Sequence, residues 1–134
     1  MIRRLYMLIT FSLLASTGCE KSPVTAKSSS TDLSGRWNYS QSYYSIGGPL
    51  IYVSTGNLHQ WIEFHTGGGF ITNMPQFQAF TSYEVLDSSK IKLIRPSPQP
   101  SERFFVRIDS AARTLDISSA DNICIEGCGN KFKR

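Results

Sequence analysis

Apolar and polar residues alternate along much of the chain from residue 33 onward. In segments such as 103–109 (RFFVRID) and 90–95 (KIKLIR), apolar residues recur at every second position. This period is typical of a β-strand with one buried and one wetter face, and the longer period of an amphipathic helix is not found. The pattern predicts about eight strands, at residues 35–44, 50–54, 58–65, 69–73, 80–86, 90–95, 103–109 and 114–118, and it allows a ninth at 130–134.

Turn-forming residues separate these strands at short intervals. Residues 66–69 (TGGG), 87–89 (DSS) and 109–113 are connections of hairpin length, so neighbouring strands should pair antiparallel. Three prolines within residues 96–100 mark a longer loop, because proline cannot sit in a central ladder. The sequence therefore predicts an all-β fold, a small antiparallel up-and-down barrel that removes its edges by closing on itself.

Residues at the inward-facing parity of these strands define the expected interior: Tyr39, Tyr43, Ile62, Phe64, Phe70, Tyr83, Val85, Ile91, Leu93, Phe104, Val106 and Ile108. The candidate ligand-binding residues are the aromatic ones among them: Tyr39, Tyr43, Phe64, Phe70, Tyr83 and Phe104. An eight-strand barrel is just wide enough for its own side chains or one small ligand, so a cavity and a filled interior are both open. Aromatic residues in 43–52 and 74–80 either anchor a protein partner, rim a cavity mouth or cover the core.

The composition is that of one folded domain. Sixteen aromatic residues and a charged content of 18% exclude a wholly disordered chain. The chain has 14 Lys+Arg against 10 Asp+Glu, but Arg3 and Arg4 belong to a segment that we expect to be removed. Twelve basic residues against ten acidic ones, without a basic run, give no footprint for nucleic-acid binding.

The first eighteen residues are predicted to be a signal peptide. A positive start (Met1–Arg4) precedes the apolar run 5–15, which is about half as long as a transmembrane helix needs to be. The segment 14–19 (LASTGC) resembles the lipobox of bacterial lipoproteins, in which cleavage precedes the cysteine and the cysteine carries the lipid. This resemblance predicts lipidation of Cys19. A short buried helix and an unmodified Cys19 in a secreted protein are the alternatives.

Residues 19–32 are expected to be a tether. After Cys19 the segment is rich in Ser and Thr and holds one valine as its only large apolar residue, so it cannot gain much by burial. Residues 33–134 then form the barrel domain. Lipoproteins that are displayed on the cell exterior often carry an acidic cluster after the cysteine, whereas here Glu20 is the only acidic residue close to Cys19. We therefore expect an anchor in the bacterial outer membrane, with the domain facing the periplasm.

A family resemblance enters at the first predicted strand. Gly35-Arg36-Trp37 resembles the G-x-W signature of lipocalins, and the layout of the following strands is similar to the lipocalin-like domains of small bacterial lipoproteins. The resemblance implies structural roles for Gly35 and Trp37, with Trp37 closing one barrel end beneath a cation, either Lys133 or Arg134. A plain core tryptophan is the alternative reading.

Cys124 and Cys128 form an even pair once Cys19 is assigned to the lipid. In an oxidising compartment such a pair predicts a disulfide, which would hold the intervening turn. A zinc site and a redox dithiol are the alternatives; a nearby histidine and the C-x-x-C spacing, respectively, are absent.

His59, Glu63 and His65 share one strand face and are the single metal-like pattern of the chain. A straight strand spreads them about 7 Å apart per pair of residues, so an outward polar face without a metal is the prediction. No nucleophile elbow, metalloprotease motif or phosphate-binding loop occurs, and we expect neither enzymatic activity nor a cofactor.

Together these patterns predict a monomeric, lipid-anchored lipocalin-like protein that binds a small apolar molecule or lipid. The alternative is a filled barrel that binds another envelope protein. An enclosed apolar cavity of about 300 Å³ or more would favour the first.

Overall fold

The chain forms a small, nearly closed antiparallel barrel, which confirms the predicted fold class. The structure is a computed structural model, and it describes residues 32–56, 58–122, 124 and 127–134. The predicted signal peptide and Cys19 lie outside the described residues. The strands, with one short 3₁₀ helix (η1), are β1 (Gly35–Tyr44), β2 (Ile51–Ser54), β3 (Trp61–Phe64), β4 (Phe70–Thr72), η1 (Pro75–Phe77), β5 (Ser82–Asp87), β6 (Lys90–Ile94), β7 (Glu102–Asp109), β8 (Thr114–Ser119) and β9 (Cys128–Lys133).

The strand order is β4-β3-β1-β9-β8-β7-β6-β5, and β2 pairs with β1 outside this path. From β5 to β9, each strand pairs antiparallel with its neighbour in sequence, as predicted. The ends of the sheet, β4 and β5, approach each other through one isolated bridge between Gly69 and Ser82. This single bridge is why the barrel is only nearly closed.

One predicted pairing is wrong: β2 and β3 do not form a hairpin. Both run antiparallel to β1, with β2 beside its second half and β3 beside its first half. The connection between them leaves the ladder and returns, since the Gln60 N–H binds the Leu58 carbonyl at 2.7 Å and the Tyr39 N–H binds the Gln60 carbonyl at 2.8 Å. Consequently β2 and β3 act as one interrupted strand, and the nine strands make an eight-strand wall.

The core fills the closed part of the barrel. Its members are Leu33, Trp37, Ile62, Phe64, Phe70, Met74, Phe77, Phe80, Ile91, Leu93, Phe104, Val106, Leu115, Ile117 and Phe132. Aromatic rings cross this interior in a continuous chain, from Tyr83 against Phe64 (5.0 Å between ring centroids) to Phe77 against Phe104 (5.8 Å). Edge-to-face and tilted contacts of this kind favour dense packing.

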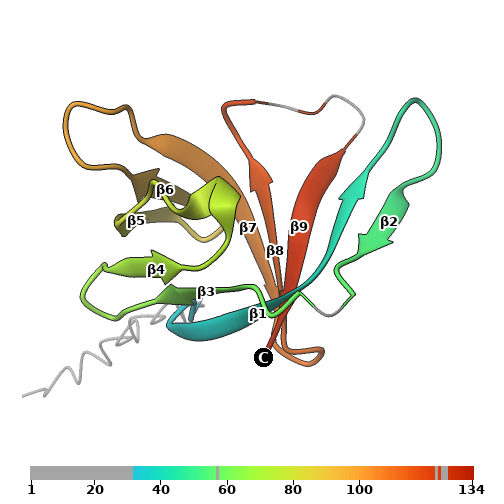
Figure 1. The fold of residues 1–134 in the computed structure, drawn as a ribbon, viewed down its shortest axis with the longest axis horizontal. Helices are drawn as coiled ribbons and strands as arrows, with labels where there is room; N and C mark the ends of the chain where they lie inside the picture. Colours follow the sequence, from blue (N-terminus) through green and yellow to red (C-terminus); the bar gives the residue numbers. More distant parts are fainter. Residues whose placement is uncertain (1–31, 57, 123, 125–126) are drawn as a thin grey trace, which may run out of the picture.

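The 74–80 segment covers the core, one of the three roles considered for its aromatic residues. Phe77 and Phe80 are buried, with 4% and 3% of their surface exposed. The corresponding residues of the β1–β2 hairpin behave differently, since Tyr44 and Tyr52 are 41% and 50% exposed. In Figure 1 this hairpin diverges from the part of the barrel formed by β3–β7.

Candidate functional site

The base of the barrel is closed by Trp37. Its ring is 1% exposed, and its indole N–H donates to the Leu33 carbonyl at 2.9 Å. The Arg134 guanidinium lies 3.9 Å from the centre of the ring and also donates to the Ser34 carbonyl. The structure therefore places a cation over Trp37, as the resemblance implied, and selects Arg134 rather than Lys133. Gly35 has φ of +99°, a conformation that favours glycine.

A cleft opens at the other end, between η1 and the strands β8, β9 and β1. It encloses about 440 Å³ and is open to solvent, so it is not the enclosed cavity that would have decided between the two predicted functions. Phe77, Phe104 and Ile117 are the buried apolar residues that line it. Its remaining lining residues are Ser42, Tyr43, Tyr44, Gln76, Glu102, Ser118, Ser119, Cys128, Gly129 and Asn130. Apolar walls with a few polar groups are typical of sites for small amphipathic molecules.

Three of the six candidate ligand-binding residues are core residues. Phe64, Phe70 and Phe104 are 1%, 3% and 6% exposed, and of these only Phe104 lines the cleft. Tyr39 and Tyr83 are half-buried and pack against the core. Tyr39 reaches towards the cleft, since its hydroxyl donates to Oδ1 of the cleft residue Asn130 at 3.2 Å.

The inward position predicted for Tyr43 is wrong. The pairing of β1 with β9 shifts register between Tyr39 and Gln41, and this bulge reverses the alternation of the residues that follow. Tyr43 therefore lies across Gly129 on the outer face, where its hydroxyl donates to Oδ1 of Asp116 at 2.7 Å. Burial, followed by this hydrogen bond, raises the pKa of the Tyr43 hydroxyl.

The same bulge turns Ser42 and Tyr44 inward, so that they line the cleft. Strict alternation assigned both to the outside, and no local signal in the sequence marks the bulge. Val85 is a second misplaced position: it is 52% exposed, because the backbone contact of β5 with the opposite end of the sheet ends at Tyr83, whose N–H donates to the Gly68 carbonyl at 2.8 Å, and the rest of β5 lies at an open margin.

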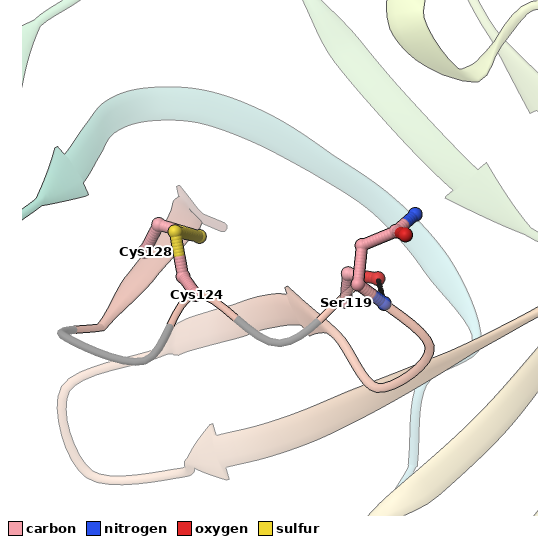
Figure 2. Close-up of a disulfide and its surroundings, with 4 residues drawn as sticks. Ser119, Cys124 and Cys128 are labelled. Atoms are coloured by element: carbon pink, nitrogen blue, oxygen red, sulfur yellow. Dashed lines mark hydrogen bonds between the residues drawn. A yellow bond between two sulfur atoms is a disulfide. The ribbon is translucent and has the colours of Figure 1, made fainter.

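The Cys124–Cys128 disulfide lies at the margin of the cleft. It joins the connection after β8 to the start of β9, and Cys128 is itself a cleft residue (Figure 2). Nearby, the Asn122 N–H binds Ser119 Oγ at 2.9 Å, and the Ser45 N–H binds the Gly127 carbonyl at 3.0 Å. The disulfide therefore holds the loop that borders the β1–β2 hairpin, and the prediction of this pair is supported.

The residues of the metal-like pattern have other partners. Glu63 forms an ion pair with Arg36 at 2.8 Å, and the Arg36 guanidinium lies 3.9 Å above the Trp61 ring. Nε2 of His65 is 3.7 Å from Oε1 of Glu63, whereas His59 offers its backbone carbonyl to Asn73. Within the part of the chain that the structure describes, no three His, Cys, Asp or Glu residues are grouped as metal ligands.

A larger hollow, of about 760 Å³, lies at the base beside Trp37. Its lining is more polar than that of the cleft and includes Arg107, Arg113 and Asp109. Because apolar walls are what a small apolar molecule needs, we take the less polar cleft at the opposite end as the candidate site.

Comparisons with family models, with curated proteins and with solved structures give no match for this chain. Among the residues that the structure describes, there is no helix with the length and apolar character of a membrane span.

Proposed function

We propose that this chain is a lipid-anchored, lipocalin-like lipoprotein of the bacterial cell envelope that binds a small apolar or lipid-like molecule, without enzymatic activity. Lipidation at Cys19 and an outer-membrane location facing the periplasm are parts of this proposal. They rest on the lipobox-like segment and on the acidic content of the tether, as argued above.

The observation that carries the proposal is the cleft between η1 and the strands β8, β9 and β1. Its volume of about 440 Å³ lies within the usual range for small-molecule sites. Phe104 and Ile117 belong to the buried cluster and also line the cleft, so an apolar chain entering it would extend the core. Ser42 and Asn130 lie opposite each other on β1 and β9 and offer hydrogen bonds to a polar end group.

A fluorescence titration with cis-parinaric acid, a fluorescent fatty acid, tests the proposal. We expect saturable binding to the full chain. The variant Ser42→Trp should fill the cleft and weaken binding about tenfold, which corresponds to the loss of about 1.4 kcal/mol of binding energy. The matched control is Gln41→Trp, since Gln41 precedes Ser42 on β1 and lies on the opposite face.

The same titration can contradict the proposal. Absence of saturable binding, or equal binding by both tryptophan variants, would overturn the cleft as a ligand site.

A filled-barrel module that binds another envelope protein is the second candidate function. The continuous aromatic packing from Tyr83 to Phe104 favours it, because these side chains occupy the interior in which larger barrels hold their ligands. A ligand-free mass for the purified full chain by native mass spectrometry, together with no binding of the fatty acid, would favour this function over the first.

A further inference from the structure

The outer edge of β2 carries backbone groups without a partner strand in the described part of the chain. β2 pairs with β1 alone and stands outside the main strand order. In Figure 1 it lies at the outer margin of the molecule, on the side of β1 away from β9. Ile51, Tyr52 and Val53 are 39%, 50% and 46% exposed, so apolar side chains remain in water on both faces of the strand. We call this side of residues 51–54 the β2 edge.

One hydrogen bond shows which residues point along the β2 edge. The Thr55 N–H donates to the Ser40 carbonyl at 3.3 Å, which continues the β1–β2 register in which Gln41 faces Ser54. Bonded and non-bonded residues alternate along an antiparallel ladder. Ile51 and Val53 therefore direct their N–H and C=O groups at β1, whereas Tyr52 and Ser54 direct theirs outward.

Of the features by which proteins usually prevent pairing at a free edge, β2 has a short length of four residues, but it contains no lysine, proline, bulge or inward charge. β2 reads Ile-Tyr-Val-Ser, and the whole stretch 37–62 contains no Asp, Glu, Lys or Arg. An edge with this composition is suited to a partner strand that is itself uncharged and apolar.

We propose that the β2 edge binds the β2 edge of a second copy of this chain, to form a two-fold symmetric dimer with a continuous sheet. This inference goes beyond the proposed ligand binding and does not depend on it. It differs from the monomer that we expected from the sequence alone.

The outward direction of Tyr52 and Ser54 limits the registers that this dimer can adopt. In an antiparallel pair, residues that face each other must both point their backbone groups at the partner, or both away from it. Two symmetric registers centred on β2 meet this condition, one with Tyr52 facing Tyr52 and one with Val53 facing Val53. The proposed dimer has the first, in which Tyr52 faces Tyr52 of the second copy and Ile51 faces Val53, because it pairs the two exposed aromatic rings directly.

Side-chain chemistry favours a second copy in this register. On the outer face Tyr43 is already the cross-strand neighbour of Tyr52, with ring centroids 5.9 Å apart, so the dimer would align four tyrosines across the sheet. On the other face, Ile51 and Val53 form apolar pairs between the copies. Aromatic and β-branched cross-strand pairs are favourable, and the residues of β2 that face each other carry no charge.

The first test is a disulfide cross-link in the full chain, purified in detergent. In the proposed register the Cα atoms at position 52 are about 5.5 Å apart, within the range for a disulfide. Tyr52→Cys should therefore give a covalent dimer under mild oxidation. Val53→Cys is the matched control, since position 53 faces position 51 and should remain at the background level of the parent chain.

The second test measures mass by sedimentation equilibrium. The parent chain should show a concentration-dependent mass of two chains. Tyr52→Lys places like charges at the two-fold axis and should weaken dimerisation about tenfold or more, whereas Ile71→Lys, at a residue that is 52% exposed on β4, should not.

A parent chain that stays monomeric, or that forms larger open-ended assemblies, would overturn the proposal. Equal dimerisation by the two lysine variants would do the same. The cysteine pair keeps the test decisive if Tyr52→Lys folds poorly, because equal cross-linking at positions 52 and 53 contradicts the register.

Discussion

The closed part of the barrel and the β1–β2 hairpin contain similar apolar residues, but these residues are buried in the closed part and exposed in the hairpin. In the closed part, aromatic and β-branched side chains are buried and polar ones face water. In the hairpin, Tyr44, Ile46 and Tyr52 are exposed, Ile46 to 78%. The difference follows from what covers each face: strands and η1 close over the first region, whereas among the described residues β2 pairs with β1 alone. Apolar content therefore predicts stability only where the topology provides a second layer.

The largest difference between an inner and an outer position is expected at the two tryptophans. Trp37 is fully enclosed at the base, so Trp37→Ala should reduce the free energy of unfolding by about 3–5 kcal/mol. Trp61 lies on the outer face of the closed part beneath Arg36, so Trp61→Ala should reduce it by about 1 kcal/mol. Urea denaturation of both variants measures this. Equal losses would contradict the assignment of Trp37 as the residue that closes the base.

A pair of valines compares the two regions directly. Val106 is 5% exposed on β7, and Val53 is 46% exposed on β2. Val106→Ala should lower the free energy of unfolding by about 2 kcal/mol, from lost burial and the cavity left behind. Val53→Ala should change it by about 0.5 kcal/mol or less. Thermal denaturation of both variants at low protein concentration measures this difference without a contribution from dimerisation. If Val53→Ala lowers the free energy of unfolding as much as Val106→Ala does, the hairpin is packed against the closed part.

The smallest effect is expected at an exposed carboxylate. The Arg103 backbone N–H, at 2.7 Å, and then its side chain hold the pKa of Asp121 below its ordinary value of 3.8. A lowered pKa in the folded state contributes stability at neutral pH, and this contribution is lost as the pH falls below about 4. Asp121→Asn should therefore flatten the acid side of the stability–pH profile. Denaturant midpoints over that pH range test it, and an unchanged slope would contradict the interaction.

Alternation and turn residues predicted the strands well, because both are local properties. The predicted 103–109 and 114–118 correspond to β7 and β8 within one residue at each end, and the ninth strand exists as β9. The pairing of β2 and β3 was predicted wrongly. The connection has hairpin length, but the Thr55 N–H and the Gln60 carbonyl bind β1, and the N–H groups of Leu58 and Gln60 bind within the connection.

The candidate site was predicted in part. Phe104 lines the cleft as expected; the side chains of Ser42 and Tyr44 face the interior against expectation, whereas Tyr43 borders the cleft with its side chain on the outer face. One bulge in the pairing of β1 with β9 caused all three changes. A bulge depends on how two distant strands fit together, and strict alternation along one strand cannot reveal it.

The sequence by itself determined the class of fold, the approximate strands and the pairing of Cys124 with Cys128, which depend on local periodicity, turn chemistry and residue counts. The cation over Trp37, either Lys133 or Arg134, was implied by the resemblance to lipocalins. Only the tertiary structure decided which face each residue of β1 takes, which strand lacks a second neighbour and where a cleft remains. Those outcomes depend on the register between strands that are far apart in the sequence, and in a sheet a shift of one residue moves every following side chain to the opposite face.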